Sequence, residues 1–183
     1  MKTHLFLPLL YSTLLILLNS VSLAAQSGGE ESVVPLRDQF GVAGGLDQHS
    51  GQVQIAIVVT AKKLRRLKPW ERAIRENYPD LPVLRVADVP VTAPTEHEQV
   101  AEKLRKRLPE DVVVLIDLDG VWSQRYQLDV SVPNLLVFDA RGELRSVHSG
   151  LYKSAAFAAF QQDLDGLLDE TPDSAQVADS QAP

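Results

Sequence analysis

The sequence predicts one α/β domain, a mixed β-sheet with helices on its faces. Apolar, β-branched segments alternate with amphipathic ones through the middle of the chain, in the order strand, helix, strand, helix, strand. Two more strands joined by a turn, and then a last helix, complete the pattern. The chain has 183 residues, 45% of them hydrophobic, which suits a single domain of ordinary core size.

The first half of the domain supplies two strand–helix pairs. VQIAIVV (53–59) is apolar without alternation, as in a strand that is buried on both faces. KPWERAIREN (68–77) has a helical composition, and LPVLRVADV (81–89) predicts the next strand. In TEHEQVAEKLRKRL (95–108) apolar residues recur every four positions, and acidic residues precede basic ones, as the helix dipole favours.

The second half predicts three strands and a closing helix. DVVVLI (111–116) is the third buried strand. NLLVF (134–138) and ELRSVHS (143–149) flank the turn sequence DARG, which predicts an antiparallel hairpin. The last helix is predicted to have an apolar side, formed by Phe157, Phe160, Leu164 and Leu168.

The two ends of the chain differ from its middle. Residues 1–25 have the pattern of a secretory signal, with Lys2, a leucine-rich stretch and small residues around a cut after Ala24 or Ala25. A retained anchor is the alternative, although the apolar stretch is shorter than the roughly 20 residues that a span needs. Residues 171–183 predict a disordered tail. We expect an exported protein, periplasmic in a Gram-negative source and otherwise secreted, without membrane contact after cleavage.

The amino-acid composition restricts the reactions and ligands that are open to this protein. The formal net charge is −6, so we expect no nucleic-acid partner. The sequence contains no Cys, which excludes disulfides and thiol catalysis. We predict no metal and no cofactor, because His49, His97 and His148 lack metal-ligand spacing and no phosphate-binding loop follows Gly44. His148 is expected on the exposed face of the hairpin.

The segment VVVLIDLDGVW (112–122) raises an enzymatic alternative. It resembles the opening of haloacid-dehalogenase-type phosphatases, in which Mg²⁺ assists and the first Asp attacks phosphorus. Asp117 would then be the nucleophile and Asp119 the acid–base residue. However, the next strand ends in Asp139, with no Ser or Thr. We therefore expect both carboxylates to shape a turn, with Gly120 in a conformation that other residues resist, and we keep the phosphatase as the alternative.

The order of elements and several segments resemble the thioredoxin superfamily. YQLDVSVPNLLVFDARGELRSVHSGLYKSAAFAAFQQDL (126–164) is similar to its closing section, with Val-Pro, a strand, a turn, a strand, a Gly and a helix. VVPLRDQFGVAGGL (33–46) is similar to the lead-in of the peroxiredoxin-like and TlpA-like branches. The resemblance covers residues 33–168 and implies a thioredoxin-like mixed sheet flanked by helices, with an N-terminal extension.

The resemblance also assigns two special positions. It implies that Pro133 is the fold's cis-proline, near the start of the 61–77 helix. The family's Cys-x-x-Cys precedes a proline that matches Pro69, which puts Ala61 and Leu64 at the cysteine positions. Neither residue is a nucleophile, so the resemblance implies the fold without its redox activity.

Five cations, here called the basic cluster, lie within seven residues at this position: Lys62, Lys63, Arg65, Arg66 and Lys68. Cations at a helix start cost roughly 0.3–1 kcal/mol each at an exposed site. One interpretation is a solvated face, or a loop before a helix that starts at Pro69. The other is a binding site for an acidic protein or an anionic ligand. We predict an exported, non-catalytic binding or accessory module, with the basic cluster as its candidate site.

Overall fold

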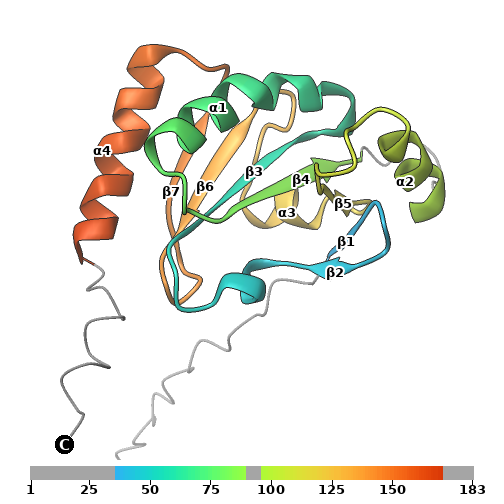
Figure 1. Ribbon diagram of the computed structural model, residues 1–183, viewed down its shortest axis with the longest axis horizontal. Coiled ribbons are helices and arrows are strands. Elements are labelled where there is room, and N and C mark those ends of the chain that lie inside the picture. Colours follow the sequence, from blue (N-terminus) through green and yellow to red (C-terminus); the bar gives the residue numbers. More distant parts are fainter. Residues whose placement is uncertain (1–35, 90–95, 171–183) are drawn as a thin grey trace, which may run out of the picture. The chain divides into compact units, whose positions relative to one another are not determined.

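The computed structural model describes residues 36–89 and 96–170, which form a seven-stranded mixed sheet flanked by helices (Figure 1). The strands are β1 (Leu36–Asp38), β2 (Ala43–Gly44), β3 (Gln54–Thr60), β4 (Val83–Asp88), β5 (Leu115–Asp117), β6 (Asn134–Phe138) and β7 (Leu144–Ser149). Their order in the sheet is β2-β1-β5-β4-β3-β6-β7. The predicted fold class is confirmed, whereas the predicted signal segment and tail lie outside the described residues.

In the described ranges, four α-helices and two 3₁₀ helices lie between or after these strands. They are η1 (Leu46–His49), η2 (Ala61–Leu67), α1 (Lys68–Asn77), α2 (His97–Arg105), α3 (Val121–Arg125) and α4 (Ser154–Glu170). Within the described ranges, no helix has the length and apolar character needed to cross a membrane.

The centre of the sheet is parallel. β3 pairs in parallel with β4, and β4 pairs in parallel with β5. All seven residues of β3 are buried, which fits the apolar run at 55–59 inside it. β5 starts at Leu115, later than predicted, because the side chain of Gln39 bonds the backbone just before it. Gln39 donates to the carbonyl oxygen of Val112 (2.6 Å) and accepts from the amide of Val114 (2.9 Å).

Helices cover both faces of this sheet. α1 and α4 pack on one face, where Trp70, Ile74 and Phe160 meet Ile55 and Ile57 of β3 (Figure 1). α2 packs beside them, on residues of β4 and β5. α3 packs on the opposite face, where its buried tryptophan contacts β6. The three predicted helices are therefore confirmed as the layer on one face of the sheet, and the short α3 covers the other face.

The predicted hairpin between β6 and β7 is confirmed. The two strands are antiparallel, with an irregularity in register between Val137 and Phe138. The Asp139 carboxylate closes the turn by accepting from the amides of Arg141 and Glu143, both at 2.9 Å. Gly142 has φ +79°, a conformation that side chains resist.

A small hairpin of β1 and β2 was not predicted. It adds to the β5 edge of the sheet, with β1 antiparallel to both β2 and β5. Asp38 Oδ1 holds its turn by accepting from the amides of Phe40 (2.8 Å) and Val42 (2.9 Å). Strands of three and two residues give no periodic signal in a sequence.

The predicted cis bond before Pro133 is wrong. Every peptide bond in the described residues is trans, including Val132–Pro133. The chain turns just before this bond, where the amide of Val132 donates to the carbonyl oxygen of Asp129 (3.3 Å). Asn134 Nδ2 then donates to the carbonyl oxygens of Asp129 and Val132, both at 2.9 Å. These bonds direct the chain into β6 with the trans isomer, which is already favoured by about 0.5–1 kcal/mol.

Candidate functional site

The two positions that the resemblance assigns to redox cysteines, Ala61 and Leu64, lie on η2, directly after β3. Ala61 packs against the core beneath α2, and Leu64 contacts both that core and the core beneath α1. Both side chains are partly buried. They therefore hold η2 to the sheet by apolar contact.

The segment between β3 and α1 is neither a loop before Pro69 nor one continuous α-helix over 61–77. Residues 61–67 form a 3₁₀ helix, and the α-helix begins at Lys68, with Pro69 in its first turn. Proline is tolerated there because the first amides of a helix have no intrahelical acceptor. The amide of Thr60, at the end of β3, donates to the carbonyl oxygen of Val130 (2.9 Å) and ties the start of η2 to the loop before β6.

Two residues of the basic cluster are used to hold this loop. Lys63 Nζ (2.8 Å) and Arg66 Nη1 (3.1 Å) both donate to the carbonyl oxygen of Ser131. The segment before Pro133 therefore lies beside η2, as the resemblance implies, although its isomer differs. The pKa of the nearby Asp129 carboxyl is lowered, chiefly by hydrogen bonds from Ser131 and also by the Lys63 charge.

The other three residues of the basic cluster project into solvent. Lys62, Arg65 and Lys68 are exposed, and none makes a side-chain hydrogen bond or ion pair with any residue that the structure describes. The first turn of η2 contains no acidic residue. These three cations are the part of the cluster that is free to contact another molecule.

The Asp-x-Asp-Gly motif caps a helix. Asp117 is fully buried, and its two carboxylate oxygens accept from the amides of Val121 and Trp122, both at 2.9 Å. Gly120 has φ +62°, and Asp119 is exposed. The predicted turn is confirmed, although among the described residues its side-chain hydrogen bonds come from Asp117 and not from Asp119. A buried carboxylate with both oxygens occupied is unsuited to attack phosphorus, so the structure gives no support to the phosphatase.

A second carboxylate lies beside Asp117. Asp88 ends β4, is in register with Asp117, and is 3% exposed. Its Oδ2 accepts from Ser123 Oγ at 2.8 Å. Burial raises the pKa of Asp88, the Ser123 hydrogen bond lowers it in part, and the Asp117 charge raises it further. The described residues contain no group of three or more His, Asp or Glu placed to hold a metal ion. Asp88 and Asp117 are therefore a pair of carboxylates without a third ligand beside them in the described part of the chain.

Replacing Asp88 with Asn should make stability less dependent on pH. Because the folded-state pKa of Asp88 is raised, its contribution to stability is fully present below the unfolded pKa and is lost as the pH rises through the folded pKa. The neutral amide of the variant would have no charge to bury. In urea denaturation, the stability of the variant relative to wild type should therefore increase from about pH 4 to about pH 8. A difference that stays constant over this range would contradict the assignment.

The remaining candidate residues have packing roles. His148 is not on an exposed face as predicted, because α4 covers it. Its Nε2 lies 3.1 Å from Asp163 Oδ2, and its ring contacts Phe160. Trp70 and Trp122 are buried, as predicted from the preference of tryptophan for cores.

Sequence reasoning missed a cavity beside α1. It has a volume of about 130 Å³ and is lined by Glu71, Ile74, Arg75, Tyr78, Pro79, Leu81, Val83 and Arg85. The Arg85 guanidinium projects from the central strand β4, and its Nε lies 2.5 Å from Glu71 Oε1. The available signal was an arginine between apolar residues at the centre of the strand.

These features define a thioredoxin-like fold in which a basic, cysteine-free segment follows the first long strand. Solved structures agree with the fold. The pneumococcal exposed lipoprotein thioredoxin (Etrx1) of Streptococcus pneumoniae has a TM-score of 0.57 and 18% identity, over 70% of this chain and 97% of that chain. A putative thiol:disulfide interchange protein DsbE from Chlorobium tepidum has a TM-score of 0.52 and 18% identity, over 73% of this chain and 92% of that chain.

A putative thioredoxin from Neisseria meningitidis is also similar, with a TM-score of 0.52 and 18% identity over 75% of this chain and 89% of that chain. No protein-family model and no curated protein matches the chain. At these identities the similarity shows the fold, and function has to be argued from the site.

Proposed function

We propose that the chain is an exported, non-catalytic binding or accessory protein that uses the basic cluster to bind an acidic partner. The observation that carries this proposal is the exposure of Lys62, Arg65 and Lys68 on a short helix, without partners in the described part of the chain. Export is supported by the signal-like residues 1–25 and by similarity to an exposed lipoprotein.

The distribution of charge favours a specific surface over a generally cationic protein. The chain carries 24 acidic and 18 basic residues, yet five of the basic residues lie in one seven-residue segment. Locally concentrated charge attracts a complementary partner, while the net charge of −6 opposes indiscriminate binding of polyanions. An acidic protein surface or peptide fits this pattern.

The cluster is also held in a fixed arrangement. Leu67 is buried, Leu64 is packed between two cores, and Lys63 and Arg66 bond the loop before β6. The exposed cations thus extend from a backbone that is already ordered, which lowers the entropy lost on binding.

The proposal predicts a selective loss of binding when the exposed cations are neutralised. The probe is a fluorescent peptide of alternating Glu and Ser, measured by anisotropy at low ionic strength. The variant K62Q/R65Q/K68Q should bind about tenfold more weakly than wild type. Added salt should weaken wild-type binding, since it screens exposed charges.

A matched control removes three exposed cations elsewhere, as K103Q/R107Q/R141Q. It changes the net charge equally and should keep most of the affinity. An equal loss in this control would show that only net charge matters. Absence of binding by the wild type at low salt would overturn the proposed function.

A further inference from the structure

The basic surface extends beyond the cluster because two kinds of helix join at Lys68. A 3₁₀ helix has three residues per turn, so Lys62, Arg65 and Lys68 lie on one side of η2. From Lys68 the chain is α-helical, where positions i, i+4 and i+7 share a face, and these are Lys68, Arg72 and Arg75. The change of helix type at Lys68 therefore aligns two rows of cations into one.

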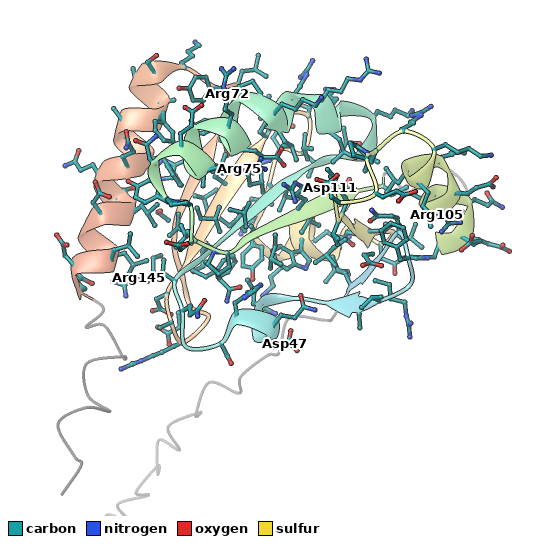
Figure 2. All side chains as sticks on the ribbon, in the orientation of Figure 1. Asp47, Arg72, Arg75, Arg105, Asp111 and Arg145 are labelled. Carbon is teal, nitrogen blue, oxygen red and sulfur yellow. The ribbon has the colours of Figure 1, made fainter. Side chains whose placement is uncertain are left out.

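All five side chains of this cationic stripe are exposed: Lys62, Arg65, Lys68, Arg72 and Arg75. Figure 2 shows Arg72 and Arg75 on α1. The rise is about 2.0 Å per residue along η2 and about 1.5 Å along α1, which makes the stripe about 22 Å long. An extended peptide advances about 3.3 Å per residue, so about seven residues span it.

The acidic residues beside the stripe do not neutralise its positive charge. A shallow depression of about 310 Å³ is lined by Lys68, Glu71, Arg72, Arg75 and Glu76. Glu71 is already paired with Arg85, and both side chains are largely buried, at 16% and 18% exposure. Glu76 is thus the one carboxylate lining this depression that has no ion-pair partner among the described residues.

We propose that the cationic stripe binds an extended acidic segment, of about seven residues, in a protein partner. This inference rests on the proposed function and specifies its partner. A small anion would require donors that converge on one point, whereas these cations lie in a line. The acidic net charge of the chain disfavours nucleic acid as the occupant.

The test uses Glu-Ser peptides of about three to ten residues, titrated against the full chain. Affinity should rise with length up to about seven residues and then level off. The variant R72Q/R75Q should weaken the longer peptides about fivefold and abolish the gain from added length. Glu76→Gln should strengthen the longer peptides. Melting curves confirm that each variant is folded.

The outcomes separate the two proposals. If K62Q/R65Q/K68Q weakens binding while R72Q/R75Q and peptide length have no effect, the cluster binds but the stripe is wrong. If neither variant weakens binding, the proposed function fails as well. A single-stranded oligonucleotide of equal charge that binds as tightly as the peptide would overturn the assignment of the partner as an acidic protein segment.

Discussion

Replacing Trp70 with Ala is expected to lower the free energy of unfolding by about 3–5 kcal/mol. The side chain is 1% exposed, and its ring contacts those of Tyr152, Phe157 and Phe160. Its Nε1 donates to the carbonyl oxygen of Gly150 at 3.1 Å. Truncation removes these contacts and leaves a cavity between α1 and α4. Urea denaturation should show a lower midpoint.

Trp70→Phe is the matched control, because it keeps an aromatic ring and removes the Nε1 donor. Trp70→Phe should lower the free energy of unfolding clearly less than Trp70→Ala does. Since α1 carries Arg72 and Arg75, the alanine variant should also weaken binding of the longer acidic peptides. A loss below about 1 kcal/mol for Trp70→Ala would contradict the packing of α1 on the core.

Asp117→Ala is expected to cost about 2–4 kcal/mol. The change leaves the amides of Val121 and Trp122 without their acceptors in a buried site. Asp119→Ala removes an exposed carboxylate from the same motif and should change stability by less than about 0.5 kcal/mol. Chemical denaturation of both variants measures this difference.

The same pair of variants separates a helix cap from a catalytic motif. A phosphatase would need both aspartates, so both changes would abolish turnover of a phosphate ester with Mg²⁺. A helix cap needs only the carboxylate of Asp117. Equal stability of the two variants, or phosphatase activity of the wild type that Asp117→Asn abolishes, would contradict the structural role.

Local sequence patterns were enough to predict most of the fold. The predicted helix 68–77 matches α1, because Pro69 suits the first turn and Ile74 lies on the apolar face. The predicted strand 134–138 matches β6, because it is followed by the DARG turn. The unbroken apolar run of β3 indicated burial on both faces. In each case the signal and the structure it predicts lie in the same short segment.

The errors involve side-chain interactions that a sequence pattern does not report, two of them between segments far apart in the chain. The late start of β5 depends on Gln39, which is more than seventy positions away in the sequence. The trans bond before Pro133 follows a turn that the side chain of Asn134 secures, and no pattern of residue types reports those bonds. His148 was placed on an exposed face because the position of α4 was not known.

The candidate site was only partly predictable. The sequence identifies a concentration of cations between the first long strand and the next helix. It does not show that Lys63 and Arg66 bond the loop at Ser131. The alignment with Arg72 also depends on the 3₁₀ helix, because a continuous α-helix would rotate Lys62 away from this face.

NMR mapping of an acidic peptide onto the isotopically labelled protein tests the central claim most directly. A seven-residue Glu-Ser peptide is titrated at low ionic strength while backbone amide shifts are followed. The account predicts that the largest, salt-sensitive shifts fall on residues 61–76, along η2 and α1. Shifts confined to another surface, such as the β7 edge of the sheet, or the absence of any shift, would contradict the claim that this basic segment is a binding surface.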